Sequence, residues 1–191
     1  MQALAAAPSP APRRQVLVGT AFACVAGTML VGGMLAVWLV IRDRAIAAEG
    51  TWVPPDVAIP EVPSNIMLIS FLALVVFAQW AVYAARRGER SSAALALGAT
   101  GLVAIAVVNA QAFVYSQMGL PIADTAYGPM FYAVTGVFLV LMAVGLAFTV
   151  VTAFRVLGGR SDGDVVAAHA LYWYFVAAAF AAIWLIVYVT K

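Results

Sequence analysis

Apolar residues run through this chain in five long stretches separated by short polar segments. The stretch from Ala126 to Phe154 has no charged residue in 29 positions. A helix of that length extends roughly 43 Å, and about 20 apolar residues suffice to cross the hydrocarbon core of a bilayer. We therefore expect a membrane-spanning helix here, with Pro129 in its first turn, where proline is tolerated.

Four further apolar stretches predict four further spans. The first, from Gln15 to Ile41, is too long for the apolar region of a signal peptide and should remain in the protein. The chain is thus expected to be an all-α integral membrane protein, a bundle of five helices with spans at about 15–41, 64–85, 92–115, 126–154 and 165–190. Residues 1–14, rich in Ala and Pro, are expected to form a disordered cytoplasmic tail.

The composition supports a membrane protein. The 191 residues are 65% hydrophobic and 9% charged, whereas a soluble domain is about 25% charged. The net charge of +2 is too small and too scattered for a nucleic-acid surface. A single cysteine, Cys24, excludes an internal disulfide framework, and its apolar surroundings predict a packed free thiol.

The segments between the spans predict an orientation. Five spans place the termini on opposite sides. One side then carries most of the basic residues, namely Arg13, Arg14, Arg86, Arg87, Arg90, Arg155 and Arg160, while the other carries Arg42, Arg44 and Lys191. The positive-inside rule puts the N-terminus in the cytoplasm and the C-terminus outside. The loop 42–63 contains four prolines and is expected to be extended, with Trp52 at the membrane interface.

Some polar and small residues inside the spans are candidates for specific contacts. Thr28, Gly32 and Ala36 recur every four positions and would let another helix approach closely, and Gly136 is a further candidate packing position. Asn109 and Gln111 need partners if they lie in hydrocarbon. Interhelical hydrogen bonds or interfacial water would satisfy these amides, and a ligand contact is the alternative. His169, one turn inside the last span, is expected to be hydrogen-bonded or solvated rather than a ligand.

The sequence shows no residue pattern typical of a catalytic site. Within the spans there is no Asp, Glu, Lys or Arg to mark a proton relay or ion path. The single histidine cannot supply a bis-His haem site, and we find no nucleophile–base pair, phosphate loop or metal-ligand spacing. No catalytic, cofactor-binding or metal-ligating residue is therefore assigned, and the chain is suited to packing against another protein.

Several short segments form an ordered set of motifs along about residues 16–190. The most specific is Tyr127-Gly128 with Phe131-Tyr132 and Thr135-Gly136, and further positions are Gln111, Tyr172 and Trp173. Together they resemble subunit III of haem–copper oxidases (cytochrome c oxidase), in the short five-helix bacterial form that lacks two helices of the first bundle. The match is divergent, because the family's intramembrane polar positions are replaced. A buried Glu of the family falls on Gly27, a second acid on Val114, and His or Asp positions on Phe138, Leu141, Tyr174 and Ala177.

The resemblance implies a non-catalytic component of an aerobic respiratory terminal oxidase in a bacterial inner membrane. Such a component packs beside the catalytic subunit and supports its stability, lipid environment and turnover. Haem and copper are then expected in the partner subunits I and II. This chain is expected to bind structural phospholipid and no nucleic acid. Because Gly27 cannot titrate, a proton-related role is not expected. An accessory protein of a nitric oxide reductase and a small transporter subunit are the alternatives.

Overall fold

The computed structural model describes residues 14–55, 57–120, 125–160 and 162–190. The described part contains no strand and consists of helices and connecting turns. The helices are α1 (Gln15–Glu49), α2 (Glu61–Arg86), α3 (Arg90–Met118), α4 (Tyr127–Leu157) and α5 (Gly163–Ile183), followed by a π-helical segment, η1 (Trp184–Val189). Five helices, the last including η1, are long and apolar enough to cross a membrane, as the sequence predicts. The expected tail 1–14 lies almost wholly outside the described residues.

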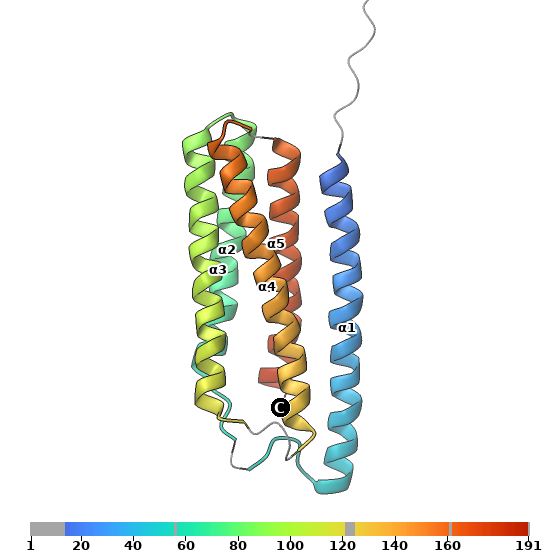
Figure 1. Cartoon of the computed structure of the whole chain (residues 1–191). Helices are drawn as coiled ribbons and strands as arrows, with labels where there is room; N and C mark the ends of the chain where they lie inside the picture. Colours follow the sequence, from blue (N-terminus) through green and yellow to red (C-terminus); the bar gives the residue numbers. More distant parts are fainter. Residues whose placement is uncertain (1–13, 56, 121–124, 161, 191) are drawn as a thin grey trace, which may run out of the picture.

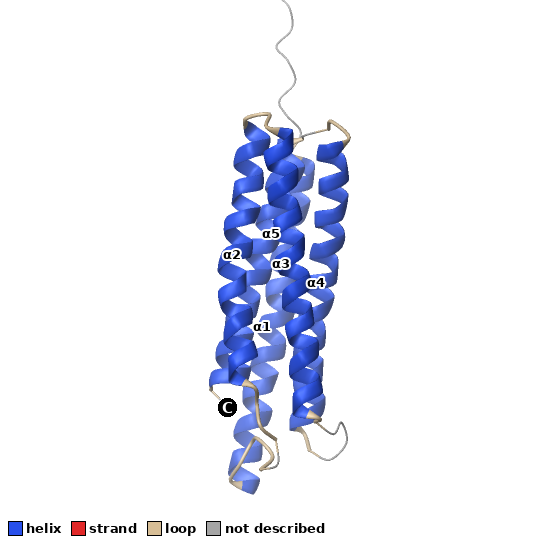
Figure 2. Ribbon diagram, turned by 90° about the vertical axis from the view of Figure 1, so that its left-hand side faces the viewer, coloured by secondary structure: helices blue, strands red, loops and turns tan. Residues whose placement is uncertain are grey.

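Helices α2, α3, α4 and α5 form an antiparallel bundle, and α1 lies beside it (Figure 1). The most extensive contact is between α2 and α3, which a tight turn joins. Helix α5 packs against α1, α2 and α4. Figure 2 shows α3 in front, with α2 and α4 on either side of it. Because α1 touches mainly α5 and also α4, most of its circumference is left exposed.

The first helix is longer than its apolar stretch. The sequence predicted a loop from Arg42, but α1 continues through the charged residues to Glu49 and ends at Gly50, whose φ of 78° is the left-handed conformation typical of a helix C-terminus. Charged residues stop a membrane span without stopping a helix, which is why the prediction of the loop start was wrong. The loop is therefore confined to the segment between α1 and α2. Where the membrane boundaries fall along the helices stays a prediction.

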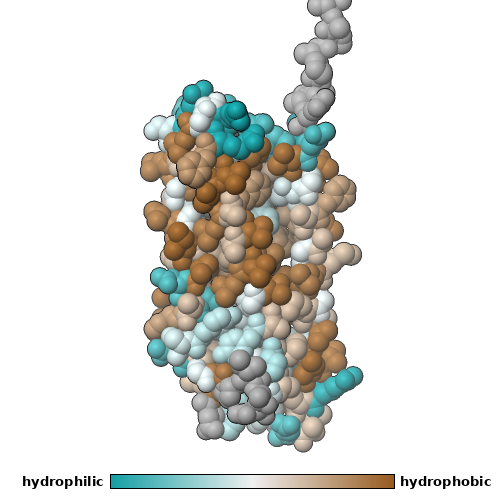
Figure 3. Space-filling model, in the orientation of Figure 1, coloured by the Kyte–Doolittle hydropathy of each residue, from teal (hydrophilic) through white to brown (hydrophobic). Residues whose placement is uncertain are grey.

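The surface has the pattern of a membrane protein. Figure 3 shows apolar residues over the middle of the bundle and hydrophilic residues gathered at the end where α1 begins. Exposed large apolar side chains occur on α1 to α4 and on η1, and Phe22, Leu72, Leu102 and Phe154 are each about 70% exposed, which in water would be unfavourable. Lipid or another membrane protein is the medium that such a surface requires.

Candidate functional site

Helix α1 is attached to the bundle along one narrow stripe of its surface. Its buried side chains are Cys24, Val31, Leu35 and Trp38, which face α4 and α5. The predicted packing residues Thr28, Gly32 and Ala36 lie on exposed positions of the same helix. A Cβ placed on Gly32 or Gly136 would meet nothing within 4 Å. No described helix of this chain packs closely against these two glycines, so their predicted role in helix packing would need a helix of another chain.

The close approach between α1 and α5 occurs at Gly27. A Cβ built on Gly27 would stand 2.5 Å from Cζ of Phe175, nearer than real Cβ contacts come. The Phe175 ring thus fills the position where the resemblance places a family acid. The sequence signalled the missing acid, but only the structure shows which side chain takes its space.

The start of α1 is held by a carboxylate from α5. The backbone N–H of Leu17, in the first turn of α1, donates to Oδ2 of Asp164 at 3.4 Å. Asp164 also lies in the first turn of α5, so one negative charge stands at the positive ends of two helix dipoles. This bond joins residues 147 positions apart and was not foreseen from the sequence.

A buried polar cluster joins α4 to α5 near the end of the bundle where α5 begins. Thr149 Oγ1 lies 2.8 Å from His169 Nε2, and the indole N–H of Trp173 lies 3.0 Å from each of these two atoms. Thr149 also donates to the carbonyl of Gly145 at 2.8 Å. Gly145 makes room for the cluster, since a Cβ there would stand 2.7 Å from Trp173 Cη2.

This cluster holds His169 in place rather than presenting it to a ligand. His169 is fully buried and hydrogen-bonded, which agrees with one of the sequence expectations. The indole N–H of Trp173 donates, while the direction of the Thr149–His169 hydrogen bond depends on the histidine tautomer; Nδ1 of His169 is buried and has no hydrogen-bond partner among the described residues. Among the described residues no group of three or more His, Cys, Asp or Glu side chains could hold a metal ion. Tyr172, next to the cluster, donates to the carbonyl of Leu141 at 2.8 Å.

An aromatic cluster closes the opposite end of the α1 stripe. Trp38, Trp52 and Tyr127 lie edge to face, with ring centroids 5.2 to 5.5 Å apart. All three are buried, so the ring of Trp52 packs against other aromatic side chains of the protein, and its predicted depth at the membrane interface stays a prediction. The polar atoms of these rings have no conventional partner in the described structure. In edge-to-face packing an indole N–H can point at the face of a neighbouring ring and form a weak N–H···π hydrogen bond.

Behind the aromatic cluster, hydrogen bonds join α3, α4 and η1. Tyr188 of η1 donates to Gln111 Oε1 at 3.1 Å, which makes Gln111 an interhelical partner. Tyr115 donates to Thr135 Oγ1 at 2.7 Å, and Tyr132 donates to the carbonyl of Leu120 at 3.1 Å. The motif residues Tyr127, Gly128, Phe131 and Thr135 are buried around this network. Asn109 lies instead on an exposed position of α3.

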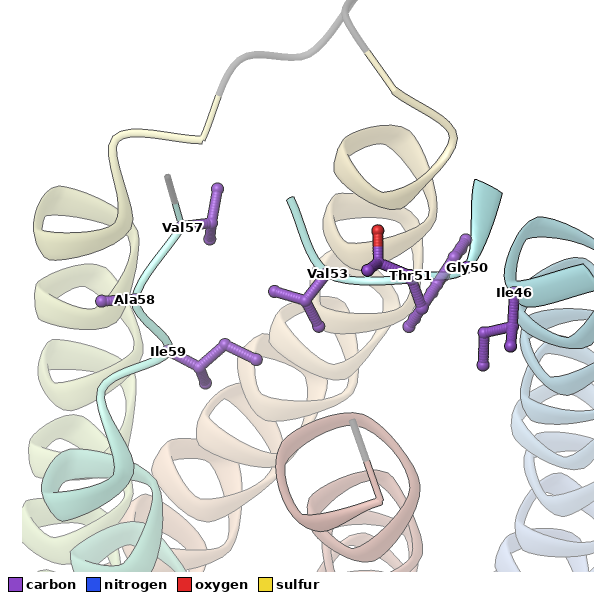
Figure 4. A pocket seen from close by; sticks show the side chains of 8 residues that line it. Ile46, Gly50, Thr51, Val53, Val57, Ala58 and Ile59 are labelled. Carbon is purple, nitrogen blue, oxygen red and sulfur yellow. The ribbon is translucent and has the colours of Figure 1, made fainter. Parts of the chain in front are cut away.

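Hollows on the surface follow the edges of α1. One of about 170 Å³ lies between α1 and α5, and one of about 470 Å³ lies between α1 and α4 around Met29, Met34 and Met130. A third, of about 570 Å³, lies under the loop after α1, where Figure 4 shows Ile46, Val53 and Ile59 around it. The residues that line these three hollows are apolar or uncharged, so they suit hydrocarbon better than a charged substrate.

The seam between α2 and the last span, formed by α5 and η1, carries polar side chains that sequence reasoning missed. Tyr174 donates to Oε1 of Gln79, and Trp184 donates to Oδ1 of Asn65 at 2.9 Å. All four residues were treated as parts of apolar spans. The sequence does show an amide and an aromatic hydroxyl within two predicted spans, and each needs a hydrogen-bond partner. It does not show that they bond each other, because that depends on how the two helices are rotated.

Comparison with known proteins finds one family. The family model for cytochrome c oxidase subunit III matches residues 45–191. Cytochrome c oxidase subunit 3 of Triticum aestivum is 31% identical over 147 residues, covering 74% of this chain and 54% of the relative. The corresponding protein of Drosophila yakuba is 31% identical over 152 residues, covering 76% and 56%. The chain thus spans about half the length of the curated relatives it matches.

Proposed function

Because this chain belongs to the cytochrome c oxidase subunit III family, we propose that it is a non-catalytic component of an aerobic terminal oxidase. In this role it packs beside the catalytic subunits I and II, which carry the haem and copper. The observation that carries the proposal is the family match together with spans that contain no Asp, Glu, Lys or Arg. A chain without redox ligands or a proton path contributes through its contacts.

The geometry around the single histidine supports a role without a redox centre. Haem ligation by histidine needs a free ring nitrogen aimed at the iron. In this chain Nε2 of His169 lies within hydrogen-bond distance of Thr149 and Trp173, and Nδ1 has no partner among the described residues but is enclosed by the protein. The sequence has no second histidine that could complete a bis-His site. The electron carriers of the complex therefore belong to its other subunits in this proposal.

The contact between Gly27 and Phe175 argues for a packing role in place of a proton-related one. An apolar ring occupies the space beside Gly27, so no carboxylate is available there to take up or release a proton. The ring instead adds apolar contact between α1 and α5. We propose that this subunit supports the complex through helix packing and bound lipid, and that it has no titratable group at the position of Gly27.

Lipid is the second part of the proposed role. The hollows beside α1 are lined mainly by apolar residues and open at the surface of a spanning helix. Acyl chains fill such hollows through van der Waals contact, because the bilayer already keeps their methylene groups out of water. We propose that phospholipid chains lie along α1 and stabilise its loose attachment to α4 and α5.

The proposed location is a bacterial inner membrane with the basic end of the bundle in the cytoplasm. The helices alternate in direction, so the start of α1 and the turns after α2 and α4 lie at one end (Figure 1). These segments hold Arg14, Arg86, Arg87, Arg90, Arg155 and Arg160. By the positive-inside rule that end is cytoplasmic and the end of η1 is outside.

Purification of the tagged chain from its native membrane in a mild detergent tests this function. We expect oxidase subunits by mass spectrometry and haem a bands in the reduced-minus-oxidised spectrum. A colourless chain without oxidase subunits in every mild detergent would contradict the proposal. Copurification of haem b and nitric oxide reductase subunits would show instead that the chain is a component of that enzyme.

A further inference from the structure

Helix α1 is packed most firmly toward the loop that follows it. Its buried side chains become more enclosed along the helix, since Cys24 is 8% exposed, Leu35 is 5% exposed and Trp38 is fully buried. The aromatic cluster described above closes over this end. None of residues 15–23, which form the start of α1, is buried. The attachment of α1 to the bundle is therefore tight at one end and loose at the other.

A long hydrogen bond ties the loose start of α1 to α5. The backbone N–H of Leu17 donates to Asp164 at 3.4 Å, which is longer than the usual range for an N–H···O bond. The start of α5 is anchored in the bundle instead, because the next residues, Val165 and Val166, are only 6% and 1% exposed. If the two helices separate at this end, α1 is therefore the helix that moves.

The contact between Gly27 and Phe175 closes one end of the hollow between α1 and α5. These two helices pack side by side and begin at the same end of the bundle (Figure 1). The hollow, of about 170 Å³, extends along α1 from Thr28 to Leu35 and along α5 from Phe175 to Ala182. A Cβ on Gly27 would stand 2.5 Å from the Phe175 ring. This contact therefore separates the hollow from the loose start of α1.

Helix α1 is long enough for a modest tilt to open this contact. Along the helix axis, Gly27 and Leu17 lie roughly 16 Å and roughly 32 Å from Trp38, taking about 1.5 Å per residue. A tilt of about 15° around Trp38 would therefore move Gly27 by about 4 Å and Leu17 by about 8 Å. The first movement separates Gly27 from the ring by about one layer of carbon atoms. The second movement breaks the hydrogen bond to Asp164.

We propose that residues 15–27 of α1 form a lateral gate, which pivots at the aromatic cluster and is latched by the bond between Leu17 and Asp164. When this bond breaks, the gate moves away from α5, Gly27 leaves the Phe175 ring, and the hollow opens toward the membrane. An acyl chain of a phospholipid in the leaflet at that end then enters the hollow. This inference rests on the lipid-binding role proposed above and adds the route by which lipid enters and leaves.

Distances between spin labels test the gate in the purified chain, kept with its copurifying subunits in lipid nanodiscs. One pair of genetically encoded spin labels replaces Val18 of α1 and Leu95 of α3, near the start of α1. A second pair replaces Val40 and Phe113, on the same two helices near the opposite end. All four side chains are at least 50% exposed. We expect Asp164→Asn to raise the long-distance fraction of the first pair at least twofold and to leave the second pair unchanged.

Two further variants control the latch and test the pivot. Asp162→Asn should leave both pairs unchanged, because Asp162 pairs with Arg155 and makes no bond to the described residues of α1. Trp52→Ala removes one ring of the aromatic cluster and should broaden the distances of the second pair. An unchanged first pair in the Asp164 variant, or equal lengthening of both pairs, would overturn the gate. An unchanged second pair in the Trp52 variant would overturn the pivot and the inference with it.

Failure of the gate and failure of the proposed lipid role give different results. A phospholipid with a photoactivatable group in the middle of its acyl chain is added to the nanodiscs, and labelling is followed at Ala179, which lines the hollow and is 8% exposed. We expect labelling in the wild type and at least threefold faster labelling in Asp164→Asn. If Ala179 is not labelled in any variant, the lipid role fails. If it is labelled equally fast in both, lipid binds and the gate is wrong.

Discussion

The ring of Phe175 on α5 occupies the space that a side chain at Gly27 on α1 would need. A Cβ at Gly27 would stand 2.5 to 3.3 Å from three atoms of that ring. The two positions therefore determine each other: a glycine allows the ring, and the ring excludes an acid. This pair gives a physical reason for the loss of a titratable group where the family resemblance expects one.

The first prediction concerns this pair. Gly27→Ala should destabilise the fold by about 1–3 kcal/mol relative to Gly33→Ala, because only the first change forces a ring to move. Gly33 is the control on the same helix, since a Cβ there meets nothing within 4 Å. Combining Gly27→Ala with Phe175→Ala should recover part of the loss. Unfolding in a denaturing detergent measures all variants, and strict additivity would contradict the contact.

A second prediction concerns the room beside Trp173. Gly145→Ala should destabilise by about 1–3 kcal/mol, because the added methyl would stand 2.7 and 2.8 Å from the Trp173 ring, which two hydrogen bonds hold in place. Gly136→Ala is the control in α4, because its added methyl meets nothing within 4 Å. The measurement is the unfolding midpoint of each variant in the same detergent. Equal midpoints for the two variants would show that Trp173 can move aside.

The hydroxyl of Thr149 is the subject of a third prediction. Thr149→Val should cost about 1–3 kcal/mol, since it removes a partner of His169 Nε2 and of the Trp173 indole inside a buried site. Thr152→Val should cost less, because the Thr152 hydroxyl bonds only the carbonyl of Phe148 in its own helix. The indole N–H resonance of Trp173 should shift in the first variant and stay unchanged in the second. A shift in both would argue against a specific cluster.

The fourth prediction concerns the start of α1. Asp164→Asn removes the charge that faces the N–H of Leu17 and the positive ends of two helices. We expect faster amide hydrogen exchange in the first turn of α1, with a loss of about 0.3–1 kcal/mol in local stability. Asp162→Asn is the control, because Asp162 pairs with Arg155 and makes no bond to the described residues of α1. Unchanged exchange at Leu17 in the Asp164 variant would refute the tether.

The number of helices could be read from the sequence, and their ends only in part. Five apolar runs of sufficient length predict five spans, since crossing a bilayer depends on local composition. The end of α1 was missed because Arg42, Asp43 and Arg44 are compatible with a helix in water. The burial of Trp52 was missed for a related reason, because a tryptophan in a loop suits a membrane interface as well as a protein core.

The candidate sites could be predicted less well than the spans. The sequence indicated that Gln111 and His169 need hydrogen-bond partners, and the structure supplies Tyr188, Thr149 and Trp173. Neither the Gly27–Phe175 contact nor the Tyr174–Gln79 bond could be foreseen, because each joins residues far apart in the chain. Pairings of this kind depend on the rotation and depth of whole helices.

The sequence alone determined that this is an all-helical membrane protein, in which five segments cross and the basic residues gather at one end. Only the tertiary structure decided which face of each helix is buried. In water, a polar face and an apolar face would have revealed that choice in the sequence. In a membrane, lipid is as apolar as the protein core, so Phe22 and Leu35 of α1 look alike in sequence, although one is exposed and the other buried. Helix packing, small residues and a few hydrogen bonds make the choice, and these exist only once the helices meet.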